Sequence, residues 1–107
     1  MATYANSSYV ARNIGTSASS VITVSAGTQA VASLIVSNTI TSPITTSVYI
    51  TRSTLDYYIV KGATIPVGGS LEVIQGNRVV LLSGDTLKVV NSAASSGDCI
   101  ASVLTAT

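Results

Sequence analysis

The sequence has 107 residues, of which 47% are hydrophobic and 8% are charged, and its formal net charge is +1. This length suits one domain with a single hydrophobic core. The five basic residues do not cluster, which argues against a nucleic-acid groove because such a groove needs a basic stripe to displace counterions. With 17 Ser and 14 Thr, hydroxyl groups supply most of the polar surface, and the small net charge leaves no electrostatic barrier to association.

Neither a targeting signal nor a disulfide pattern is visible in the sequence. No apolar run approaches the roughly 18 residues of a membrane span, and the first residues lack the basic-then-apolar order of a signal peptide. Cys99 is the single cysteine, so no intrachain disulfide can form. We expect a soluble chain, made inside the cell, that binds neither membrane nor nucleic acid.

The first segment, residues 1–19, is rich in Ser, Ala and Asn and has no sustained hydrophobic period. One interpretation is a frayed terminus or a first edge strand, since chain ends are often loose. The other is an N-terminal arm that attaches to a neighbouring subunit through Tyr4, Tyr9 and Arg12, because aromatic residues and Arg are enriched as interface anchors.

The rest of the chain, residues 20–107, has the pattern of an all-β domain. Val, Ile and Thr make up 38 of the 107 residues, and branching at Cβ favours strands over helices. In Ile44–Arg52, the strand period places Ile44, Thr46, Val48 and Ile50 on one face and Thr45, Ser47, Tyr49 and Thr51 on the other. The other predicted strands are Ser20–Ser25, Ala30–Thr39, Asp56–Lys61, Ser70–Gln75, Arg78–Leu82, Asp85–Asn91 and Asp98–Thr105.

Short segments rich in Gly, Pro, Asn, Asp and Ser separate these strands, and none is long enough for a helix. We therefore predict an antiparallel β-sandwich of seven to eight strands, jelly-roll or immunoglobulin-like, with a small barrel as the alternative. The residues predicted to face its core are Leu34, Val36, Val48, Ile50, Leu71, Val73, Leu87 and Val89.

Asp85 lies in "SGD", between the apolar runs "RVVLL" and "TLKVV". A glycine followed by Asp at this place is typical of a tight hairpin, in which the carboxylate accepts backbone N–H groups. A structural Asp85 of this kind predicts that Asp85→Asn changes stability by about 1 kcal/mol or less.

A catalytic Asp85 would need a base, a second carboxylate or a metal nearby. The chain has no His, and its other acids, Asp56, Glu72 and Asp98, lie far from one another in sequence. A calcium site at Asp85 or Asp98 is weakly indicated, because no loop shows dense alternating oxygen ligands. We expect no catalytic residues, no cofactor and no metal site.

Tyr57 and Tyr58 are neighbours on a predicted strand and should point to opposite faces, so one is expected in the core and the other in solvent. An exposed Tyr can stack on a sugar, which keeps a carbohydrate-binding module among the alternatives. Such modules usually align several aromatic side chains, and the chain has no Trp.

The runs "YYIVKGATIPVGGSLEVI" and "RVVLLSGDTLKVVNSAASSGDCIASVL" resemble the small β-sandwich virion proteins of tailed phages, particularly the capsid cement (decoration) proteins of cyanophages. The resemblance covers roughly residues 44 to 105, and the opening "MATYANSSYVARNIG" is similar in style. The pattern also recurs in phage tail and fibre-associated proteins.

This resemblance implies a non-enzymatic virion protein on the capsid surface, synthesised in the host cytoplasm. Its implied partners are the major capsid protein, whose neighbouring capsomers it bridges, and further copies of itself in a homotrimer. The family has no catalytic residues to transfer. A tail or head-fibre component is the alternative.

Overall fold

A computed structural model describes the backbone of residues 4–75 and 78–106. Within these ranges the chain forms strands and no helix. The strands are β1 (Tyr4–Ile14), β2 (Ser19–Thr23), β3 (Thr28–Asn38), β4 (Ile44–Arg52), β5 (Leu55–Ile65), β6 (Ser70–Glu72), β7 (Val79–Leu81), β8 (Thr86–Asn91) and β9 (Gly97–Ala106).

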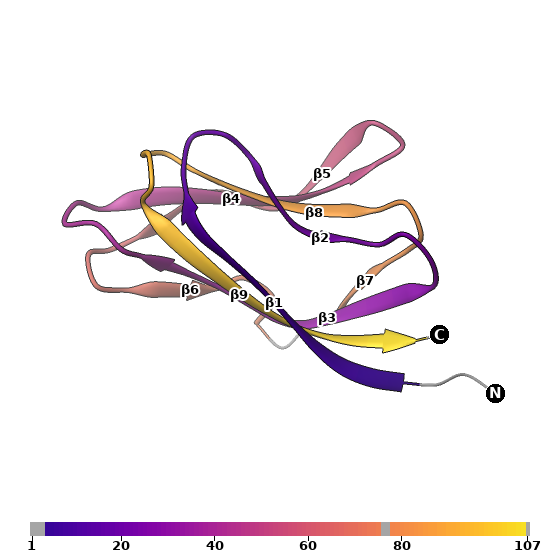
Figure 1. The fold of residues 1–107 in the computed structure, drawn as a ribbon. Helices are drawn as coiled ribbons and strands as arrows, with labels where there is room; N and C mark the ends of the chain where they lie inside the picture. Colours follow the sequence, from indigo (N-terminus) through magenta and orange to yellow (C-terminus); the bar gives the residue numbers. More distant parts are fainter. Residues whose placement is uncertain (1–3, 76–77, 107) are drawn as a thin grey trace.

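The strands form two sheets that pack face to face (Figure 1). The first sheet has the order β1-β9-β3-β6, with β7 also paired to β3, and the second has the order β2-β8-β4-β5. The strand pairings described in both sheets are antiparallel. The predicted all-β antiparallel sandwich is confirmed, and two separate sheets take the place of a closed barrel. The described residues form nine strands where seven to eight were predicted, because β1 adds a strand that the sequence pattern did not show.

Strand β1 lies at the edge of the first sheet, and its register with β9 is continuous from Tyr4↔Ala106 to Ala11↔Cys99. Of the interpretations left open for residues 1–19, the structure therefore shows a first edge strand over Tyr4–Ile14. The sandwich therefore includes β1, whereas the sequence placed the start of the sandwich domain at residue 20. The sequence pattern missed the strand because pairing along β9 uses backbone groups and needs no apolar alternation.

Other strand bounds differ from the prediction for local reasons. Strand β5 continues past Lys61 because Gly62, at φ 69°, takes up an extra residue as a β-bulge between the pairs Thr46↔Ala63 and Val48↔Val60. Strand β6 is shorter than predicted and ends at Glu72.

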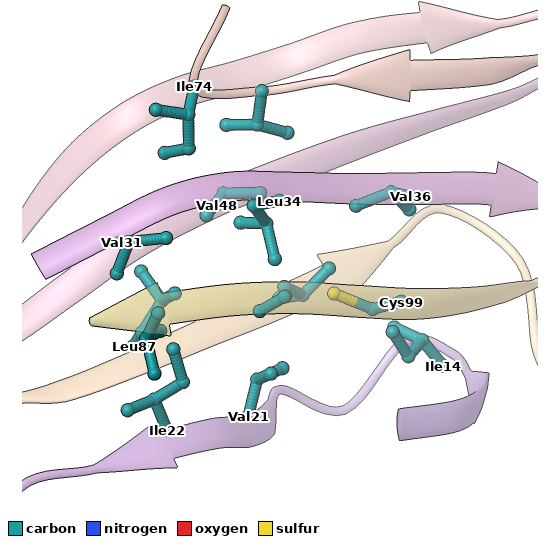
Figure 2. Packing of buried hydrophobic residues seen from close by; sticks show 14 of the residues in the cluster. Ile14, Val21, Ile22, Val31, Leu34, Val36, Val48, Ile74, Leu87 and Cys99 are labelled. Carbon is teal, nitrogen blue, oxygen red and sulfur yellow. The ribbon is translucent and has the colours of Figure 1, made fainter. Parts of the chain in front are cut away.

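The core fills the space between the sheets with aliphatic side chains, among them Leu34, Val48 and Leu87, and with Cys99 (Figure 2). Six of the eight predicted core residues are buried. The exceptions, Ile50 and Leu71, are only partly buried. Leu71 lies on the edge strand β6, and Ile50 lies near the end of a hairpin whose following residues 55–58 are exposed.

The β4–β5 hairpin turns through Ser53 and Thr54, which both have left-handed backbones with φ of 53° and 65°. Two positive φ values in a two-residue turn define the type I′ geometry, which favours Asn-Gly. A β-branched residue such as Thr54 is strained in this region because its Cβ crowds the backbone.

We therefore expect Thr54→Gly to raise the free energy of unfolding by about 1 kcal/mol, since the strain of a left-handed non-glycine residue is about 1–2 kcal/mol and glycine loses some entropy on folding. Urea titration followed by circular dichroism measures the change. Thr54→Val is the matched control, because it keeps the branched Cβ and should give no gain. Equal stabilities for the Gly and Val variants would contradict the prediction.

Candidate functional site

Asp85 occupies the turn between β7 and β8, and its side chain is 1% exposed. Its Oδ1 accepts a hydrogen bond from Arg52 Nε at 2.8 Å, and its Oδ2 accepts one from Arg52 Nη2. The same Oδ2 accepts the backbone N–H of Leu82 at 2.8 Å. Gly84 has a φ of 93°, which allows the tight turn, and Val24 donates its N–H to the Asp85 carbonyl oxygen at 3.0 Å.

Asp85 therefore shapes a turn and also binds the end of β4. The turn follows from the local sequence, but the Arg52 pair does not, because the two residues are 33 positions apart. We therefore expect Asp85→Asn to change stability by more than the roughly 1 kcal/mol that a turn contact alone predicts, since a charge-assisted pair to a buried carboxylate adds to it.

The electrostatics of Asp85 favour a fixed anion. The hydrogen bonds from Arg52 are the largest cause of a lowered pKa for the Asp85 carboxyl, while burial acts in the opposite direction. The same contact raises the pKa of Arg52. This geometry therefore holds Asp85 ionised, whereas a general acid needs a pKa that is raised to near the working pH.

Glu72, on edge strand β6, is a second carboxylate whose hydrogen bonds are made within the fold. Burial raises its pKa, but the hydrogen bonds that it accepts outweigh burial and the pKa is lowered overall. The donors are Ser33 Oγ at 2.7 Å and the N–H groups of Leu34 at 3.0 Å and Ile74 at 3.2 Å. Glu72 thereby joins β6 to β3 on one side and to the segment after β6 on the other.

The remaining acids, Asp56 and Asp98, also accept hydrogen bonds from their own chain. Asp56 Oδ1 accepts from Thr51 Oγ1 at 2.8 Å, and Asp98 Oδ1 accepts the N–H of Asn13 at 3.1 Å. Within residues 4–75 and 78–106, no three His, Cys, Asp or Glu side chains gather where they could hold a metal ion. In the same ranges no helix is long and apolar enough to cross a membrane.

Cys99 lies on β9 in the centre of the core and is fully buried. Burial raises the pKa of its thiol to about 12. Since the thiolate is the reactive form, the folded chain offers neither a nucleophile nor an accessible disulfide partner at this position.

Of the predicted interface residues, Tyr4, Tyr9 and Arg12 all lie on β1. Tyr9 packs partly against the chain's own core, whereas Arg12 is exposed. The side chain of Tyr4 lies outside the described part of the structure. The strand therefore presents Tyr9 and Arg12 on opposite faces, and the inward ring of Tyr9 is partly used within its own subunit.

Exposed apolar side chains gather at the β4–β5 hairpin. Leu55, Tyr57 and Tyr58 are all exposed on β5, so the expectation that one of the two tyrosines enters the core is wrong. Both are exposed because β5 is an edge strand and its start is uncovered. Tyr58 stacks on Tyr49 with ring centroids 4.9 Å apart, and a surface hollow beside the hairpin is lined by Ile50, Arg52 and Tyr57.

A second apolar group crosses the outer face of the first sheet. Val10 is 73% exposed, Ile100 52% and Ile35 38%. The register places Val10 opposite Ile100 and Ile100 opposite Ile35, so the three side chains form one row across β1, β9 and β3. The sequence does not reveal this row, because it arises from strands that are distant in the chain.

Comparison with protein-family models and with curated proteins found no match. Among solved structures, the chain is similar to a protein from Bacillus endospore appendages, which are described as a family of disulfide-linked pili. The TM-score is 0.61 at 16% sequence identity, over 98% of this chain and 89% of the other. A likeness at this identity shows a shared β fold.

Proposed function

We propose that this protein is a non-enzymatic structural subunit of a phage particle, a cement protein that binds the outside of the capsid and bridges neighbouring capsomers. The observation that carries the proposal is that the reactive groups of the chain are used within the fold while large apolar side chains are exposed. Its four carboxylates and its thiol are used within the fold, while the hairpin and the outer face of β1, β9 and β3 expose large apolar side chains. Exposed apolar patches mark interaction surfaces.

The hairpin is the proposed attachment site for the major capsid protein. Tyr57 is exposed beside Arg52, which Asp85 holds in place, while Leu55 is exposed at the start of β5 and Tyr58 on the opposite face of the hairpin. Tyr and Arg are the residues most enriched among binding hot spots. A rigid domain that binds only the assembled shell stabilises the shell by mass action. Self-association as a homotrimer remains part of the proposal on the basis of the resemblance over residues 44–105.

A tail or fibre component is the second candidate, and the likeness to an appendage protein supports it. The disulfide linkage described for those pili would not be available through Cys99, which is buried. A carbohydrate-binding role for Tyr57 and Tyr58 is a third candidate, and a glycan array tests it directly.

The expected result for the capsid proposal is that purified protein binds to particles from which it has been removed and raises the temperature at which they release DNA. Electron microscopy should then place it at capsomer junctions. Tyr57→Ser should abolish binding without unfolding the protein, because Tyr57 is exposed. Val67→Ser, at an exposed apolar residue in another loop, is the control and should bind normally. Density on a tail or fibre instead would select the second candidate.

A further inference from the structure

The outer face of the β1-β9-β3 sheet is self-complementary in its arrangement of residues. Its apolar row consists of Val10, Ile100 and Ile35, which the register places side by side. Two residues further along the same face, β1 carries Arg12 and β9 carries Asp98. The inward side of these strands is fixed by buried Cys99 and Ala101, so residues 98 and 100 point outward.

The charges lie on neighbouring strands with opposite signs. Arg12 is exposed and Asp98 is partly exposed. Among the described residues, the one ion pair within 4.0 Å joins Arg52 to Asp85, so Arg12 and Asp98 do not pair with each other in the isolated subunit. They lie in adjacent strands, beyond Val10 and Ile100 respectively.

Consider a twofold axis that runs parallel to the strands, above the outer face and midway between β1 and β9. This axis brings the outer faces of two copies together. Such an axis places β1 of one copy over β9 of the other. Val10 then faces Ile100 of the second copy and Arg12 faces its Asp98, and each contact occurs twice. This reciprocity is the requirement for an isologous dimer.

We propose that two copies of this chain pack through these faces as a symmetric dimer. Sheets pack about 10 Å apart with strands aligned to within about 30°, which the paired β1 and β9 strands allow. The net charge of +1 provides little repulsion between copies. This inference uses the first sheet and leaves the hairpin of the second sheet free to bind the capsid. It gives a dimer where the resemblance implies a homotrimer, so the measurement of oligomeric state below decides between the two.

Sedimentation velocity of the purified chain over a range of concentrations tests the dimer. We expect a concentration-dependent dimer whose Kd rises at least about tenfold in Val10→Lys, because the lysine places a charge in the apolar row. Val67→Lys, on the β5–β6 loop, is the matched control and should leave the Kd unchanged. Thermal unfolding at low concentration verifies that both variants fold.

A charge exchange tests the geometry. Arg12→Glu should raise the Kd by about tenfold, and the double variant Arg12→Glu with Asp98→Lys should recover most of that loss. A chain that is monomeric up to about 1 mM, a trimer in place of a dimer, or association with no charge recovery would each overturn the proposal.

Discussion

Leu34→Ala should lower the free energy of unfolding by about 2–5 kcal/mol, the range for removing a fully buried Leu side chain. Leu34 lies in the middle of β3, a strand that pairs with β9, β6 and β7. Its side chain points into the space between the sheets (Figure 2). The loss combines the transfer free energy of the removed methyl groups with the cavity that the rigid neighbouring strands leave unfilled.

Guanidinium titration of the variant, compared with the original chain at one concentration, measures this loss. Leu55→Ala is the control of the same residue type, because Leu55 is 59% exposed at the start of β5. It should cost less than about 1 kcal/mol, since little apolar surface is removed from contact. Equal losses for Leu34→Ala and Leu55→Ala would contradict the placement of the core between these two sheets.

The sequence predicts a large part of this fold because most core strands have one buried face. Alternation in Ile44–Arg52 places Val48 inward, and the structure buries it. Strand β1 lacks this signal, because its inward side chains Tyr9 and Ala11 are only partly buried and its pairing depends on β9. Exposure near strand ends is also hidden from the sequence, as Ile50 shows.

The interaction surfaces are less predictable than the core. The local sequence identifies the turn at Asp85, since Gly84 and Asp85 have the chemistry that such a turn requires. The partner Arg52 and the Val10–Ile100–Ile35 row depend on which strands become neighbours, and that information appears only with the register. Surface chemistry built from cross-strand contacts leaves no short motif.

Asp85→Asn should lower the free energy of unfolding at neutral pH by about 1.5–3 kcal/mol, the range for a hydrogen bond to a charged group. The Asn side chain can still accept the N–H of Leu82. It cannot accept two bonds from Arg52, and its amide group places donors against the guanidinium donors. Asp56→Asn, at an exposed aspartate in the β4–β5 hairpin, is the control and should change stability by less than about 0.5 kcal/mol.

The acid dependence of stability distinguishes the charge of Asp85 from its shape. Its folded pKa is lowered, chiefly by Arg52, so the stability that it contributes is present above the unfolded pKa of about 4. That contribution is lost as the pH falls below about 4 and through the folded pKa. Urea titrations at successive pH values should therefore show the difference between the original chain and Asp85→Asn shrinking towards pH 2. In Arg52→Gln the loss should be smaller and should end at a higher pH, because the main cause of the lowered folded pKa is gone and the folded and unfolded pKa values lie closer together. A difference that stays constant from pH 6 to pH 2 would mean that the ionised carboxylate adds nothing beyond its hydrogen-bonding shape.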